Sequence, residues 1–291
     1  TMPNFSGIIN PYLTAPNAEL LFDAELKKVY DFLLEILPSP EPVYLFMRRY
    51  DYLNAKLILK AEFLGVDISD RLSHMGTIEP KKLLTYITDR NFEELPEILT
   101  EAIEESLDAF NLTRDPQIID FILDKACYKN MQSDAKKYQD PFLIDLIKKL
   151  TDIANIRIII RTGLLGQSEE FLKKALIEAG SFSIDAPFNL TEQNWNEFIN
   201  ILEEADLKTL SSKLAKAFEN KHSISEIEKI LDDYIISFLK PSKFTTLGLD
   251  PVIAYLFLKE TEIKNARLII TGIINKIPQE TVKERLRMSY A

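Results

Sequence analysis

The sequence predicts an all-α protein that consists of three similar domains. Glycine is scarce, with 8 residues among 291, while leucine, isoleucine, glutamate and lysine dominate, and this mixture favours helix over sheet. A helical motif occurs three times at a period of roughly 100 residues, which is longer than the unit of a solenoid. A chain of three like domains favours a ring, a funnel or an arc, and such shapes suit binding and mechanics better than catalysis.

The three copies of the motif align without a gap on Asn54, Asn155 and Asn265. Each copy has a proline fourteen positions before the asparagine, a leucine nine before, a basic residue six before and an acidic residue three before; a basic residue two positions after is followed by three aliphatics. The acidic residues are Asp51, Asp152 and Glu262, and the later basic residues are Lys56, Arg157 and Arg267. These nine residues form the predicted structural signature.

Apolar residues flank the signature on two sides of a helical wheel, so each signature helix is expected to be central and largely buried. A buried asparagine must form hydrogen bonds, because an unpaired buried amide costs roughly 1–3 kcal/mol. We expect each one to bind the backbone of a neighbouring helix. The acidic residue and the basic residue one turn before it are expected to pair. An asparagine that recurs three times is more typical of packing than of a ligand site.

The helices are expected in the following order. The run 19–37 has apolar residues at three- and four-residue steps, and Pro38 and Pro40 then open the first signature helix. The second copy should contain helices near 80–89, 92–108, 116–131 and 141–166, and the third near 191–204, 205–220, 223–239 and 251–276. The predicted domains are 1–66, 67–166 and 167–291. The first is expected to be incomplete at its N-terminus, because it lacks the short helices that open the other two.

Composition excludes several classes of protein. The net charge of −10 and the pI near 5.0 disfavour nucleic acid as a partner, because such binding depends on clustered Lys and Arg. The single cysteine, Cys127, cannot form an internal disulfide, which fits a reducing cytoplasm. No apolar run approaches the roughly 20 residues that span a bilayer.

Residues typical of catalysis are sparse. His74 and His222 are the only histidines, and neither lies at metal-ligand spacing from a second His, Cys or acidic pair. The sequence contains neither a phosphate-binding P-loop nor the Gly-x-Ser-x-Gly motif of hydrolases. Cys127 and the sole tryptophan, Trp195, are expected to pack in the core. We therefore expect no catalytic residues, cofactor, metal or small-molecule substrate.

Two segments resemble a known family. Residues 49–56, Arg-Tyr-Asp-Tyr-Leu-Asn-Ala-Lys, are similar to its first conserved segment, and residues 259–272 together with 277–286 are similar to its C-terminal segment. The family is the C subunit of the archaeal and bacterial V/A-type ATP synthase, which is known as the d subunit in eukaryotic vacuolar ATPases. The resemblance covers the chain from end to end and is most specific near the C-terminus.

The resemblance implies a fold, a role and partners. Members are all-helical, and their three similar domains form a funnel with pseudo-threefold symmetry in the rotor of the complex. The base of the funnel rests on the membrane proteolipid ring, its mouth receives the central shaft, and the protein passes torque between them during ion transport without an active site of its own. This places the chain in the cytoplasm, peripheral to the membrane. Family members begin with additional helices that this sequence lacks.

One alternative uses the same tripled helices without the family. A helical scaffold or adaptor unrelated to rotary ATPases would present a concave groove for peptide or helix ligands. An enzyme is a third class, which a deep pocket lined by perturbed acidic residues would favour.

Overall fold

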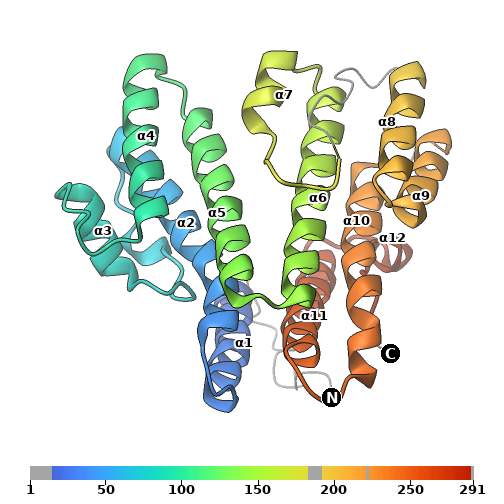
Figure 1. The fold of residues 1–291 in the computed structure, drawn as a ribbon, viewed down its shortest axis with the longest axis horizontal. Coiled ribbons are helices and arrows are strands. Elements are labelled where there is room, and N and C mark those ends of the chain that lie inside the picture. Colours follow the sequence, from blue (N-terminus) through green and yellow to red (C-terminus); the bar gives the residue numbers. More distant parts are fainter. Residues whose placement is uncertain (1–14, 183–191, 221–222, 290–291) are drawn as a thin grey trace. The chain divides into compact units, whose positions relative to one another are not determined.

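The computed structural model describes residues 15–182, 192–220 and 223–289, and every regular element in these ranges is a helix (Figure 1). The prediction of an all-α protein is therefore confirmed. The chain divides into two compact units. The middle unit is Ser39–Asn194, and the terminal unit combines Thr1–Pro38 with Trp195–Ala291.

The middle unit is organised around one long helix, α5, which packs against α2, α4 and α6. Its core contains fully buried side chains of these helices, including Phe46, Leu123 and Ile156, and it also buries Cys127 as predicted. The elements of this unit are α2 (Glu41–Leu64), η2 (Ser69–Arg71), α3 (Pro80–Thr88), α4 (Glu97–Thr113), α5 (Gln117–Tyr138), α6 (Pro141–Leu164) and α7 (Glu169–Ala175).

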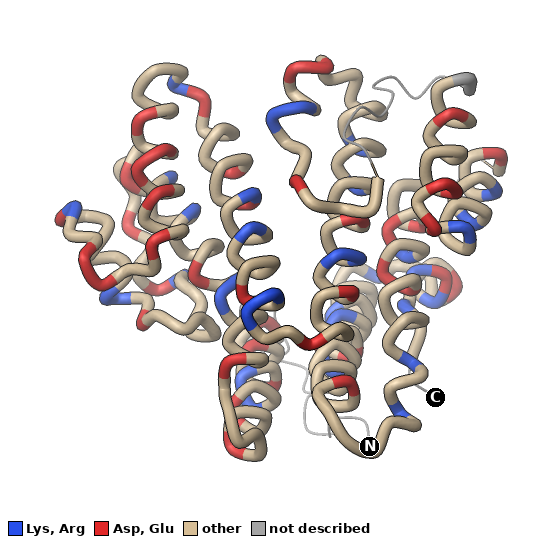
Figure 2. The backbone as a smooth tube through the Cα atoms, viewed as in Figure 1, with Lys and Arg blue, Asp and Glu red and all other residues tan. Residues whose placement is uncertain are grey.

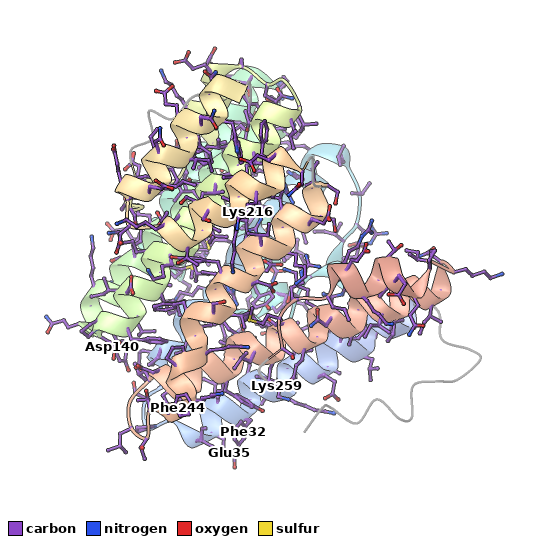
Figure 3. The ribbon with its side chains drawn as sticks, turned by 90° about the vertical axis from the view of Figure 1, so that its right-hand side faces the viewer. Phe32, Glu35, Asp140, Lys216, Phe244 and Lys259 are labelled. Carbon is purple, nitrogen blue, oxygen red and sulfur yellow. The ribbon has the colours of Figure 1, made fainter. Side chains whose placement is uncertain are left out.

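The terminal unit joins the two ends of the chain. Its elements are α1 (Ala15–Ile36), α8 (Glu192–Glu204, whose first turn belongs to the middle unit), α9 (Lys208–Glu219), α10 (Ile224–Leu239), η3 (Lys240–Phe244), α11 (Asp250–Ile274) and α12 (Gln279–Arg285). Helices α1 and α11 run side by side, and Figure 3 labels Phe32 on the first and Lys259 on the second. The Tyr30 hydroxyl donates to Glu260 across this contact at 2.9 Å. Trp195 is buried and stacks on Phe218, as core packing predicts.

The expected helices are present, although several differ in their bounds: α1 begins earlier, at Ala15, and α9 begins later, at Lys208. The helix expected at 92–108 is α4, which begins only after Pro96, because a residue that precedes proline is disfavoured in the α conformation. The helix expected at 116–131 is α5 and continues to Tyr138. The signature helices α2, α6 and α11 each begin at or beside the predicted proline.

Candidate functional site

The first signature asparagine binds a single backbone residue in the segment that follows its own helix. Asn54 Nδ2 donates to the carbonyl oxygen of Ser73 at 2.8 Å, and Asn54 Oδ1 accepts from the Ser73 amide at 2.8 Å. The side-chain amide thus uses both its donor and its acceptor group on the backbone of one residue. We call this two-bond arrangement an asparagine clamp.

The other two copies repeat the clamp. Asn155 bonds to the carbonyl and the amide of Ile177 at 2.7 and 2.8 Å. Asn265 bonds in the same way to Arg287, at 3.0 and 2.8 Å. The expectation that each asparagine binds a neighbouring helix is therefore wrong, because the clamped residues lie in non-helical segments.

The clamped residues share a local conformation. Each follows a leucine that ends a short helix, and these leucines, Leu72, Leu176 and Leu286, have extended backbone with ψ of 138°, 139° and 132°. An extended chain offers the N–H and C=O of one residue to the same side, as paired strands do. The asparagine amide therefore substitutes for the peptide group of a neighbouring strand.

Burial differs among the three clamps. Asn54 and Asn155 are 0% and 2% exposed, whereas Asn265 is half-buried. Water has little access to the first two, so their amides depend on the clamp for hydrogen bonds.

The acidic residue of the signature holds the same segment at a second point. Asp51 accepts from the Thr77 amide and hydroxyl at 3.0 and 2.6 Å, and from the Ile78 amide at 3.0 Å. Asp152 accepts from the Ser181 amide and hydroxyl at 2.5 and 2.6 Å. Burial raises the pKa of both carboxyl groups above the usual range, while these hydrogen bonds oppose the increase. Each hydroxyl residue stands four positions after the clamped residue.

A glycine precedes each of these hydroxyl residues because the carboxylate occupies the space of a side chain. A Cβ at Gly180 would lie 2.6 Å from Asp152 Oδ1, and one at Gly76 would meet Asp51 Oδ1 even more closely. Helical spacing alone did not predict this feature. Its signal in the sequence is the hexapeptide Leu-x-x-x-Gly-Thr/Ser, which occurs at 72–77 and 176–181.

The third copy uses different acidic groups. Glu262 pairs with Lys259 at 2.7 Å, which is the pairing expected from their spacing. The extended segment of the third copy instead contacts α10. Arg287 Nε lies 2.9 Å from Asp232, and the Met288 amide donates to Asp233 at 2.6 Å. Residues 290–291, which align with the glycine and the hydroxyl residue, lie outside the described residues.

In the first copy, the basic residue expected to pair with Asp51 joins α2 to α5. Arg48 pairs with Asp134, while Lys56 and Lys60 bond to Asp124 and Asp120 at 2.5 and 2.6 Å. These three ion pairs form a ladder between α2 and α5, and the charged positions on both helices are visible in Figure 2.

The basic signature residue of the third copy also contacts a neighbouring helix, and that of the second copy acts electrostatically on one. Arg267 pairs with Glu19 of α1 at 2.9 Å and lies over the Phe22 ring at 5.2 Å. Burial raises the pKa of Tyr128 on α5 to about 12, and the positive charge of Arg157 opposes this increase. In the first and third copies, the signature therefore contacts the following segment through its asparagine and a neighbouring helix through its basic residue.

Each signature helix ends in the same way. The residue eleven positions after the asparagine has a positive φ, and these residues are Gly65, Gly166 and Lys276. The next amide returns to the helix: Val66 to Ala61, Gln167 to Thr162 and Ile277 to Gly272. These bonds define a Schellman cap, which normally places glycine at the left-handed position.

The described ranges contain neither a cluster of metal-binding residues nor a membrane-spanning helix. They contain no group of three or more His, Cys, Asp or Glu residues placed to hold a metal ion. None of the described helices is long and apolar enough to cross a membrane. His74 lies in the segment after η2, and His222 lies outside the described residues.

Comparison with known proteins identifies the family. The model of the ATP synthase (C/AC39) subunit family matches residues 5–285. The C subunit of a V-type sodium ATPase from Enterococcus hirae is 28% identical over 98% of this chain and 87% of its own length. The C subunit of an A-type ATP synthase from Methanocaldococcus jannaschii is 23% identical over 92% and 71% of the two chains. Its counterpart from Thermococcus kodakarensis is 25% identical over 91% and 74%.

The resemblance noted in the sequence is therefore confirmed. The match includes all three signature helices and most of the segments that follow them, so the repeated motif extends across the matched region. The chain belongs to the ATP synthase (C/AC39) subunit family.

Proposed function

We propose that this protein is the central-stalk rotor subunit of a V/A-type rotary ATPase and joins the central shaft to the membrane proteolipid ring. It contributes mechanics and no catalysis of its own. Family membership carries the assignment to a rotary ATPase, and the relatives agree with it, because they are named as C subunits of a V-type sodium ATPase and of A-type ATP synthases. An adaptor unrelated to rotary ATPases has no comparable support.

The repeated signature supports the mechanical part of the proposal. A coupling element must transmit torque without yielding, and each signature helix is fixed both to the segment after it and to a neighbouring helix. We propose that the nine signature residues serve this purpose. The α2–α5 ladder joins two long helices along much of their length.

Two helix contacts support a cyclic order of the three copies, as a pseudo-threefold funnel requires. In the middle unit, the signature helix α2 of the first copy packs against α5, the helix that precedes the signature helix in the second copy. In the terminal unit, the signature helix α11 of the third copy packs against α1, the helix that precedes the signature helix in the first copy. Both contacts join one copy to the next when the copies are counted in a circle.

The proposal places the protein in the cytoplasm, bound peripherally to the membrane through the complex. The test is affinity purification of the tagged full-length protein from gently solubilised native membranes, read by mass spectrometry. We expect shaft and proteolipid subunits in a fixed ratio to the tagged chain. Recovery of other proteins without these subunits would overturn the proposal.

A functional measurement distinguishes coupling from mere assembly. Lys56→Glu places a second negative charge beside Asp124 and disrupts the α2–α5 ladder, whereas Lys27→Glu changes an exposed pair on α1. We expect the first variant, and not the second, to lower ion transport per ATP hydrolysed in the purified complex. An unchanged ratio in a complex that retains Lys56→Glu would contradict a role for the ladder in torque transmission.

A further inference from the structure

The middle unit contains a groove of about 520 Å³ between α4, α5 and the segment that follows α7. Its floor is apolar and half-buried to buried, and includes Ile98, Ala102, Ile118, Phe121, Ile122 and Ala126. The alanines leave space for the backbone of an approaching element. The groove shares only Ile177 with the three clamps described above.

The two long walls of the groove carry opposite charge. Glu101 and Glu105 lie on α4, while Lys125 and Lys129 lie on α5. Figure 2 shows acidic positions along α4 and basic positions along the neighbouring α5. The ion pair of Lys129 with Glu101 crosses between them, but it is 3.9 Å long and exposed on both sides, so it contributes little stability.

We propose that this groove binds one amphipathic helix of another subunit of the complex, with a basic edge toward α4 and an acidic edge toward α5. This inference rests on the function proposed above. A helix that lays its apolar face in a groove and its charged edges along the rims is a common mode of recognition. Opposite charge on the two walls fixes the chain direction of the bound helix along the groove. A helix bound in the reverse direction would place its basic edge beside the lysines of α5 and its acidic edge beside the glutamates of α4.

The end of the groove is held by the second clamp. Ile177, which Asn155 binds, lines the groove together with Glu178. Gln132 donates to the Glu178 carbonyl at 3.0 Å and to the Thr151 hydroxyl at 3.3 Å. Because α5, α6 and the clamped segment are bonded together there, a helix in this groove would rest on a fixed surface and would transmit force to the signature helix α6.

Photo-cross-linking in the assembled complex tests the proposal. Benzoyl-phenylalanine replaces Phe121 on the groove floor, and in a control variant it replaces Leu112, which is 87% exposed near the end of α4 and does not line the groove. Mass spectrometry then identifies the cross-linked peptide. We expect the Phe121 variant, and not the control, to capture one segment of another ATPase subunit, with apolar residues at helical spacing and charged edges of the stated signs.

Three outcomes would overturn the proposal: a cross-link back into this chain, a lipid adduct, or no adduct although shaft and proteolipid subunits co-purify. The last result would leave the proposed function standing while the groove is empty. If the subunits do not co-purify at all, the proposed function fails first.

A charge reversal, added to the variant that carries benzoyl-phenylalanine at position 121, sharpens the test. Glu105→Lys turns one acidic rim position into a repulsive one, and we expect it to lower the cross-linked fraction roughly ten-fold. Glu104→Lys makes the same change at the adjacent, exposed position outside the groove and should leave the fraction unchanged. Equal effects of the two substitutions would show that general charge, not the groove, governs capture.

Discussion

The second and third copies of the signature use the same clamp in different surroundings. Around Asn155 the clamp is buried, Asp152 holds the segment at a second point, and a glycine caps the helix. Around Asn265 the clamp is half-buried, Glu262 pairs within its own helix, and Lys276 occupies the cap position. The asparagine clamp is thus common to both copies. The additional carboxylate contact and the glycines occur in the copy whose clamp is buried from water.

The largest expected effect comes from removing the asparagines. Asn155→Ala leaves the buried amide and carbonyl of Ile177 unpaired, so we expect a loss of about 2–4 kcal/mol in the free energy of unfolding. Asn265→Ala should cost about 1–2 kcal/mol, because water can reach Arg287. Urea unfolding followed by circular dichroism measures both. Asn275→Ala, at an exposed asparagine, should cost under about 0.5 kcal/mol; equal losses at Asn155 and Asn265 would refute the comparison.

The next effect tests the close approach of backbone to carboxylate. Gly180→Ala places a methyl group 2.6 Å from Asp152 Oδ1, and we expect a loss of about 1–3 kcal/mol. The same substitution in an Asp152→Ala background should cost much less, because the obstructing oxygen is gone. Additive losses in this double-mutant cycle would show that the glycine is required for another reason.

The helix caps should respond in opposite directions. Gly166→Ala forces a side chain into left-handed backbone, and we expect a loss of about 1 kcal/mol, although no atom lies within 4 Å of the new Cβ. Lys276→Gly relieves the same strain in the third copy and should add about 0.5–1 kcal/mol to stability. Thermal unfolding of the two variants measures both signs. A destabilised Lys276→Gly would mean that the lysine side chain contributes more than its backbone strain costs.

The smallest expected effect concerns pH. Burial raises the pKa of Asp51 in the folded protein, so the folded state binds a proton at a pH where the unfolded chain does not, and stability falls as pH rises through that window. Asp51→Asn does not titrate. The stability of the native chain relative to this variant should therefore increase when the pH is lowered from 7 to 5. Urea unfolding at both pH values checks the sign, and a decrease would mean that the Thr77 and Ile78 hydrogen bonds outweigh burial.

The sequence predicts the helices and the placement of the signature better than it predicts the partners. Helical periodicity puts the asparagine among apolar side chains, and Asn54 and Asn155 are indeed buried. The partner is harder to find, because the clamped residue follows its asparagine by 19 residues in the first copy and by 22 in the others. A gap-free alignment of the helices does not extend through loops of different length.

Helical spacing also failed to predict the glycine beside the carboxylate and the ion-pair partner of Arg48, for different reasons. The hexapeptide Leu-x-x-x-Gly-Thr/Ser is not repeated in the third copy, which has Tyr290 where glycine would stand. The predicted pairing of the acidic and basic signature residues is present at Glu262 but not at Arg48, because Asp134 on another helix competes for the arginine. Local spacing cannot anticipate a partner that tertiary packing supplies. The division into 1–66, 67–166 and 167–291 stays a prediction, and the first two clamps cross its boundaries.

The spacing of the clamps also orders events in time. Asn54 and Ser73 are separated by 19 residues, so their hydrogen bond can form soon after α2 has been synthesised. Glu19 and Arg267 are 248 residues apart, so their ion pair can form only after most of the chain has been made. Contacts between near neighbours close small loops at little entropic cost, and distant ones close slowly. We therefore expect the middle unit to fold while the chain is still being synthesised, whereas α1 cannot pack against α11 until α11 has been made. The contact between α1 and α11 should then form after the contacts of the middle unit.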